Sequence, residues 1–309
     1  MKGYLYILSA ITAWGFEYVL VKAAGPETSP FLAGTVIFGI AGILLMGSLL
    51  CRGKLDMERM QRNLKSMLLI GLVSAACNVC WITGTQLTTV TNAAVLGRTD
   101  IMFTLLLTAL IFHERIRKAA LLFVPVMLTG VWLVLDLKPD RLSFGYTGDW
   151  LVIVSALLLS VNAFIIKRNL QDAGGTLLAL GNCTVNIAVF AAVQLLYAPN
   201  GFLTEKTWNT LPALAGCGVC SFLFFIGYYQ SLKVLPVWEV RLLSLAVPVV
   251  AAASGYFILG ETASPGNAGG MLLVMAGAAG ILLTGRYSMK DFIQKINFMK
   301  AKKVNYVDI

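Results

Sequence analysis

Long apolar runs follow one another along almost the whole chain, separated by short polar segments. Each run has about 20 residues, the length that an α-helix rising 1.5 Å per residue needs to cross roughly 30 Å of hydrocarbon. Most prolines fall in or beside the connections, where they interrupt helices. The pattern predicts ten membrane-spanning helices, at residues 3–24, 31–51, 65–86, 92–112, 119–135, 149–168, 177–197, 211–231, 238–259 and 266–284.

Composition agrees with a membrane protein. The chain has 309 residues, of which 58% are hydrophobic and 13% are charged, and its mean hydropathy is +0.79. A soluble domain of this size carries about 25% charged residues. Because the run 3–24 follows only one basic residue and precedes nine further spans, we interpret it as the first helix and not as a signal peptide.

Lysine and arginine are distributed unevenly between alternate connections. The connections on the side of the amino terminus, with the carboxyl-terminal tail, carry 18 of them, whereas the opposite set carries three. Cytoplasmic connections are enriched in these residues. We therefore expect an integral protein of the cell membrane, surrounded by lipid bilayer, with both termini in the cytoplasm. The same distribution explains the net charge of +9 without a nucleic-acid partner.

The two halves of the chain resemble each other at an offset of 145 to 147 residues. The segment Leu110–Glu114 aligns with Phe257–Glu261, and Lys22 aligns with Lys167. Five spans per half is an odd number, so the second half enters the membrane from the opposite side. The expected fold is an all-α polytopic membrane protein of ten transmembrane helices in two inverted five-helix repeats. Its parts are a first repeat at 1–136, a second at 137–284 and a basic cytoplasmic tail at 285–309.

Motifs of enzymes and metal sites are missing from the sequence. It has no P-loop, HExxH or GxSxG motif, and His113 is its single histidine. The pairs Cys77/Cys80 and Cys217/Cys220 fall within apolar helices, where cysteine packs as a small hydrophobe. We expect no catalytic residue, no metal, no cofactor and no enzymatic activity. A membrane-embedded lipid enzyme is only a distant alternative.

Short motifs in both halves resemble the EamA family of the drug/metabolite transporter superfamily. They are Trp14-Gly15 followed by Lys22, the segment Gly84–Leu87, and the helix-end acids Glu114 and Glu261. The resemblance covers residues 3–284. It implies a central cavity lined by helices one, three and four and by helices six, eight and nine, with helices five and ten at the periphery. It also implies transport of amino acids, other metabolites or drugs, often outward.

Three ionisable residues lie well inside the expected spans, where such residues are functional candidates. Helix rise places Glu17 roughly 21 Å from the cytoplasmic end of its helix, and Arg98 and Asp100 roughly 9 to 12 Å from the outer end of theirs. Glu17 and Arg98 are thus at similar depth. The hypothesis is that Arg98 pairs with Glu17 or Asp100 in one state, and that substrate perturbs this pair. The alternative is a purely structural ion pair.

Aromatic and amide residues complete the expected site. Rings supply contact area to an amphipathic solute and amides fix its orientation. Glu239 and Arg241 begin the ninth helix, either as an inner gate or as an exposed interfacial pair. The candidate substrate-binding or gating residues are Trp14, Glu17, Tyr18, Asn78, Trp81, Thr85, Arg98, Asp100, Asn162, Tyr228, Tyr229, Trp238 and Arg241.

These expectations favour a secondary transporter, and specifically an exporter, of a small metabolite such as an amino acid. It would work by alternating access through the central cavity. Efflux of drugs or hydrophobic cations is the alternative. The sequence does not decide between proton-coupled transport, with Glu17 as the proton carrier, and facilitated diffusion. It does not indicate the oligomeric state either.

Overall fold

The computed structural model describes residues 2–24, 29–53, 55–112, 116–137, 145–197, 205–260 and 264–286. Within these ranges, nine helical segments are long and apolar enough to cross a membrane, and Lys118–Val134 is a shorter apolar one. The expected all-α membrane fold is therefore confirmed. Residues 136 and 137 lie at the end of one described range, whereas the tail at 285–309 lies outside these ranges beyond Arg286, and the division into these parts stays a prediction. The elements are α1 (Lys2–Ala24), α2 (Pro30–Cys51), α3 (Met57–Arg62), α4 (Leu64–Gln86), α5 (Val90–Leu96), α6 (Thr99–Leu107), η1 (Thr108–Phe112), α7 (Lys118–Leu121), α8 (Phe123–Val134), α9 (Thr147–Ala173), α10 (Gly175–Tyr197), α11 (Glu205–Val234), α12 (Val237–Leu243), η3 (Ser244–Ala246), α13 (Val247–Leu259) and α14 (Pro265–Arg286).

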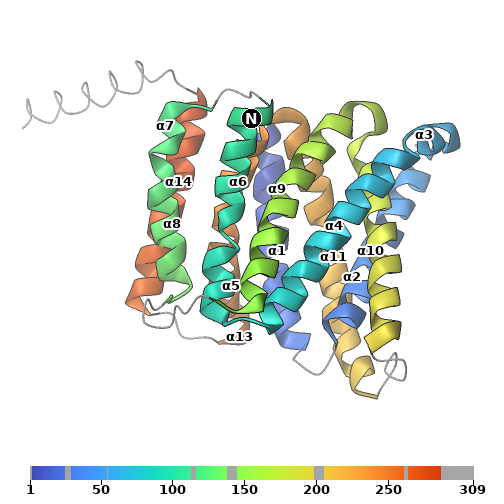
Figure 1. Ribbon diagram of the computed structural model, residues 1–309, viewed down its shortest axis with the longest axis horizontal. Helices are drawn as coiled ribbons and strands as arrows, with labels where there is room; N and C mark the ends of the chain where they lie inside the picture. Colours follow the sequence, from blue (N-terminus) through green and yellow to red (C-terminus); the bar gives the residue numbers. More distant parts are fainter. Residues whose placement is uncertain are drawn as a thin grey trace, which may run out of the picture.

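The long helices stand side by side in one bundle (Figure 1). The amino terminus, α3 and α7 lie at the upper edge of this view, whereas α5 and the end of α13 lie at the lower edge. The upper edge therefore carries the connections that are rich in lysine and arginine. We call it the amino-terminal side and the lower edge the opposite side.

The contacts between helices have counterparts when each span of the first half is exchanged with the corresponding span of the second half. The first span, α1, packs on the eighth, α11, just as the sixth, α9, packs on the third, α4. The contact of α2 with α11 likewise corresponds to the contact of α10 with α4. The α2–α10 and α8–α14 contacts each join corresponding spans of the two halves, so the exchange leaves them unchanged. This pattern is what a pseudo-twofold axis between two inverted five-helix repeats produces.

The fourth and ninth spans are both interrupted at matching positions. Gly97 and Arg98 separate α5 from α6, and Ser244–Ala246 form a tight turn between α12 and α13. Pro248 lies in the first turn of α13, where its missing N–H leaves no helical hydrogen bond unmade. At an offset of 147 residues Gly97 falls on Ser244. Interrupted helices of this kind line the central sites of many transporters.

The peripheral pair α8 and α14 cross at very short range. A Cβ atom on Gly270 would lie 2.6 Å from the carbonyl oxygen of Gly130 and 2.7 Å from the backbone nitrogen of Val134. A Cβ atom on Gly130 would lie 2.8 Å from the carbonyl oxygen of Gly270. Glycine is thus required on both sides, because only hydrogen leaves room for the two backbones.

Candidate functional site

Two adjoining cavities occupy the centre of the bundle. The wide cavity, of about 530 Å³, lies on the opposite side and is lined mainly by the ends of α1, α4, α5, α8 and α13. The deep cavity, of about 190 Å³, is lined in addition by α9 and α12. The two cavities share four lining residues, which are Trp14, Tyr18, Trp81 and Arg98.

The wide cavity has a mostly apolar wall. Valine, alanine and proline side chains from α1, α5 and α13 form most of it. Thr85 adds a hydroxyl, which donates within α4 to the carbonyl of Ile82 at 2.9 Å. Lys22 and Arg98 are the charged residues among its described lining, so both described charges are positive.

Two aromatic rings stand where the cavities meet. Trp14 is held on α1 by Phe224 of α11, with ring centroids 5.1 Å apart. Trp81 packs against the interruption in the fourth span, because a Cβ atom on Gly97 would lie 2.8 Å from its ring. Gly97 thereby leaves room for the ring of Trp81, which lines the same two cavities as Arg98.

A buried ion pair closes one wall of the deep cavity. The guanidinium of Arg241 on α12 binds the Oδ2 atom of Asp100 on α6, and these side chains are 3% and 6% exposed. Ser160 of α9 donates to the backbone carbonyl of Asp100 at 2.7 Å and so fixes α6 against α9. The remaining oxygen of Asp100 and the Nε atom of Arg241 have no hydrogen-bond partner. Each member of the ion pair therefore keeps one polar atom that is free to form a further hydrogen bond.

Arg98 is positioned differently from Arg241. It lines both cavities and is half-buried, and it forms no salt bridge with any described carboxylate. Its Nε atom is buried without a hydrogen-bond partner. In this conformation Asp100 pairs with Arg241 and not with Arg98. The pairing of Arg98 with Glu17 or Asp100 stays a prediction for another state.

Glu17 faces away from the cavities. Its carboxylate accepts a hydrogen bond from Ser221 of α11 at 2.9 Å, and it is not among the residues that line either cavity. Trp14 and Tyr18, on the same helix, line both cavities. The difference arises because α1 faces the cavities on one side and α11 on the other.

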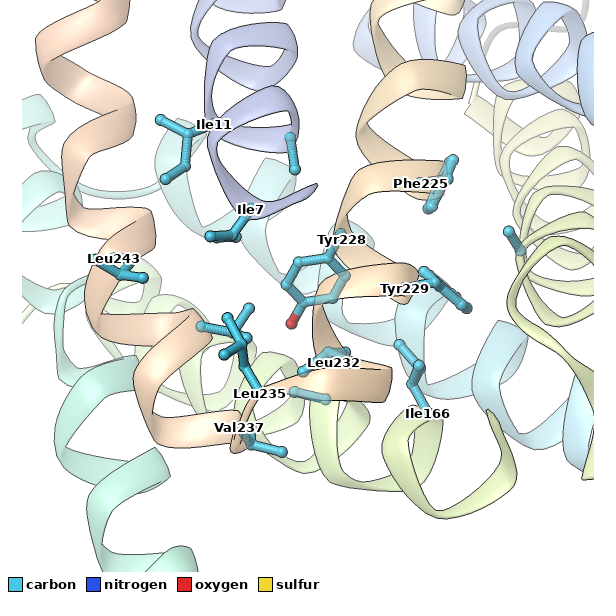
Figure 2. Close-up of a cluster of buried hydrophobic side chains, with 14 of the residues drawn as sticks. Ile7, Ile11, Ile166, Phe225, Tyr228, Tyr229, Leu232, Leu235, Val237 and Leu243 are labelled. Atoms are coloured by element: carbon cyan, nitrogen blue, oxygen red, sulfur yellow. The ribbon is translucent and has the colours of Figure 1, made fainter. Parts of the chain in front are cut away.

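The expected participation of the eighth helix is also not found in the described cavity lining. A Cβ atom on Gly227 of α11 would lie 2.6 Å from the carbonyl oxygen of Tyr6 on α1, so the two backbones touch and leave no space between them. Tyr228 and Tyr229 are consequently core residues, 5% and 1% exposed. Figure 2 shows both rings projecting from α11 within the core, where Tyr228 stacks on Phe224 with ring centroids 5.1 Å apart and Tyr229 meets Phe225 edge to face at 6.0 Å.

Two further candidates lie outside both cavities. Asn162 on α9 is buried, and its side-chain oxygen has no partner. Trp238 on α12 is 1% exposed and packs in the main core. The helix-end acids Glu114 and Glu261, and also His113, lie outside the residues that the structure describes.

A chain of amides that the sequence analysis missed leads from the core to the deep cavity. Tyr229 accepts from Asn182 at 3.1 Å, Asn182 accepts from Asn186 at 2.7 Å, and Asn186 accepts from Asn78 at 2.9 Å. Asn78 lines the deep cavity. Asn182 and Asn186 are four residues apart on one face of an apolar span, and this spacing was the available signal.

A second cluster closes the bundle on the amino-terminal side. Glu239 of α12 accepts from the hydroxyl of Tyr4 at 2.7 Å and forms a salt bridge with Arg117, which precedes α7. The Arg117 guanidinium also lies over the ring of Trp238, 5.3 Å from its centroid. Lys167 donates to the carbonyl of Leu235 at 2.7 Å. We call Tyr4, Arg117, Trp238 and Glu239 the amino-terminal latch.

The interpretation of Glu239 and Arg241 as an exposed interfacial pair is wrong. Both residues are 3% exposed, and each binds a different partner. They are two positions apart on α12, so their side chains point in different directions. Glu239 joins the latch, whereas Arg241 reaches the deep cavity.

Comparison with known proteins agrees with this architecture. A protein of Methanothermobacter thermautotrophicus described as an uncharacterized transporter is 25% identical, over 92% of this chain and 84% of its own. A probable amino-acid metabolite efflux pump of Salmonella typhimurium is also 25% identical, over 60% of this chain and 64% of its own. A crystal structure with 20% identity superimposes with a TM-score of 0.80, over 92% of this chain and 97% of the other, and so shares the fold.

The family match covers both halves. Residues 1–136 and 146–283 each match the EamA-like transporter family. The two matched segments contain the inverted repeats, and the cavities lie between them. The chain is thus an integral membrane transporter that belongs to the EamA-like transporter family.

Proposed function

We propose that the protein is a secondary carrier that exports a small metabolite, such as an amino acid, by alternating access. The observation that carries this proposal is the asymmetry between the two sides of the bundle. The wide cavity reaches the rim on the opposite side, where Leu135 and Leu259 are each 37% exposed. The amino-terminal side is closed by the latch. Two inverted repeats provide a second conformation in which these roles exchange.

The orientation in the membrane identifies the side to which the cavity opens, and export as the direction is supported by the efflux pump among the relatives. The connections that are rich in lysine and arginine lie on the amino-terminal side, which the positive-inside rule assigns to the cytoplasm. The conformation would then be open to the outside and closed to the cytoplasm. The Salmonella relative, described as a probable amino-acid metabolite efflux pump, supports the same substrate class.

Transport by the purified protein tests the function directly. In proteoliposomes preloaded with an unlabelled amino acid, we expect the labelled form to accumulate transiently by counterflow. No ATP and no covalent reaction is required, because exchange through one central site is sufficient. Liposomes without protein are the control. Failure of amino acids, other metabolites and drugs alike to exchange would contradict the carrier function.

Weakening the latch is expected to open the amino-terminal side. Glu239→Gln keeps the size of the side chain but removes the charge that holds Arg117 and Tyr4 together. Loss of charge-assisted hydrogen bonds costs about 1.5–3 kcal/mol, so we expect the ratio of closed to open protein to fall by roughly tenfold or more. The measurement is labelling of Leu235→Cys, a buried position on that side, by a membrane-impermeant maleimide.

A reporter on the other side gives the reciprocal readout. In a background without native cysteines, Leu259→Cys on the rim of the wide cavity should lose reactivity as Leu235→Cys gains it. The matched control is Glu58→Gln, which removes an exposed carboxylate on the amino-terminal side. Equal labelling of both reporters with and without Glu239→Gln would show that the latch does not govern access.

A further inference from the structure

The charges around the deep cavity do not balance. Among the described residues, its lining contains Arg98, Asp100 and Arg241, which sum to one excess positive charge. Asp100 and Arg241 neutralise each other in their buried salt bridge. The excess therefore resides on Arg98. The wide cavity offers no compensation, because its described charged residues are Arg98 and Lys22.

An uncompensated guanidinium within a membrane span is costly. Insertion measurements place the penalty for arginine at the centre of a span at about 2.5–3.5 kcal/mol. Such residues normally pair with an acid or face a water-filled cavity. Of the acids within the neighbouring spans, Asp100 is paired with Arg241, and Glu17 accepts from Ser221 and lines neither cavity. Arg98 instead borders both cavities and retains a buried Nε atom without a partner.

The shape of the site indicates what kind of group completes it. A guanidinium presents a planar fork of donors that matches a carboxylate. The rings of Trp14 and Trp81 flank the same position and line both cavities. Beyond them, the wide cavity is mostly apolar. A bound molecule would therefore meet one cation and an aromatic, aliphatic wall.

From this arrangement we infer that the substrates are organic carboxylates with an apolar or aromatic body. Arg98 binds the carboxylate where the two cavities meet, and the body extends into the wide cavity beside Trp14 and Trp81. This inference rests on the proposed carrier function and narrows it. It includes amino acids with apolar side chains and excludes hydrophobic cations, because Arg98 repels them.

A matched series of four ligands tests the inference on the unmodified protein. Phenylalanine and 3-phenylpropanoate carry the carboxylate, whereas phenethylamine and phenylalaninol lack it and keep the ring. We expect the two carboxylates to stabilise the purified protein against thermal unfolding and the other two to leave it unchanged. Preferential binding of the amine, or no binding by either carboxylate, would overturn the inference.

Substitutions at Arg98 locate the binding group. Arg98→Gln should weaken carboxylate binding by about 10- to 100-fold, and Arg98→Lys should weaken it less, because it keeps the charge but not the fork. Lys233→Gln, which removes an exposed positive charge that lines neither cavity, is the matched control and should change affinity by less than about threefold. Unchanged affinity in Arg98→Gln would overturn the inference.

Transport assays separate this inference from the carrier function. Counterflow of phenethylamine without counterflow of either carboxylate would overturn the substrate class and leave the carrier function intact. Arg98-dependent carboxylate binding without any counterflow would support the site and contradict the carrier function. The two proposals therefore fail in different experiments.

Discussion

Asp100→Asn is expected to lower the free energy of unfolding by about 3–5 kcal/mol. The substitution leaves the Arg241 guanidinium buried at 3% exposure without its counter-ion. Breaking a buried pair by removing one partner costs this much, because the remaining charge is neither hydrated nor neutralised. Denaturation of the purified protein in detergent, followed by circular dichroism or by intrinsic fluorescence, measures the loss.

Two further variants make the result specific to the pair. Glu17→Gln also removes a carboxylate from within a span, but Glu17 is bound by the hydroxyl of Ser221 and by no described cation, so we expect a change below about 1 kcal/mol. The double variant Asp100→Asn/Arg241→Gln removes both charges and should recover most of the lost stability. Equal losses in Asp100→Asn and Glu17→Gln would show that the pair does not stabilise the fold.

Gly270→Val should separate α8 from α14 and destabilise the protein by more than about 3 kcal/mol. Even a single Cβ atom at this position would lie 2.6 Å from the carbonyl oxygen of Gly130. Because the obstructing atoms belong to the backbone, they cannot rotate away as a flexible side chain does. Overpacking ordinarily costs 1–3 kcal/mol, and a backbone clash on both sides of a helix crossing exceeds that range. Thermal unfolding in detergent provides the measurement.

The neighbouring glycine provides the control. A Cβ atom on Gly269 would meet no atom within 4 Å. Gly269→Ala should be neutral or stabilising by up to about 1 kcal/mol, because alanine favours the helix, whereas Gly270→Ala should be destabilising. The two substitutions are chemically identical and one residue apart. The same sign of effect at both positions would refute the close crossing.

Hydropathy located the spans well because the thickness of the bilayer determines their length. The span expected at 31–51 is Pro30–Cys51, and the one expected at 65–86 is Leu64–Gln86. The ends of helices that extend into polar surroundings were predicted less accurately. The sixth span, for example, ends at Ala173 and not at residue 168. The interruption at Gly97 and Arg98 was not anticipated, since glycine weakens a helix but is also frequent within continuous membrane-spanning helices.

Residue contacts around the site were harder to predict than the residues themselves. Arg98, Asp100 and Arg241 were all identified, because charges within a span are rare. Which of them pair depends on the rotation of α6 and α12 about their axes, and a helix turns by about 100° for each residue. Glu17 was expected near Arg98 from depth alone, and depth carries no information about rotation. The latch was missed at Tyr4 and Arg117, since both are ordinary residues at helix ends.

In the proposed transport cycle, the excess positive charge of the deep-cavity lining would respond to voltage. With a substrate of net charge −1 bound, such as 3-phenylpropanoate, the charge at Arg98 is cancelled, and the loaded protein changes conformation without net charge in the deep cavity. The empty protein changes conformation with that charge exposed to the transmembrane field. One elementary charge moved through 100 mV corresponds to about 2.3 kcal/mol. The membrane potential would then act mainly on the return of the empty carrier, so that net flux depends on voltage more strongly than exchange does.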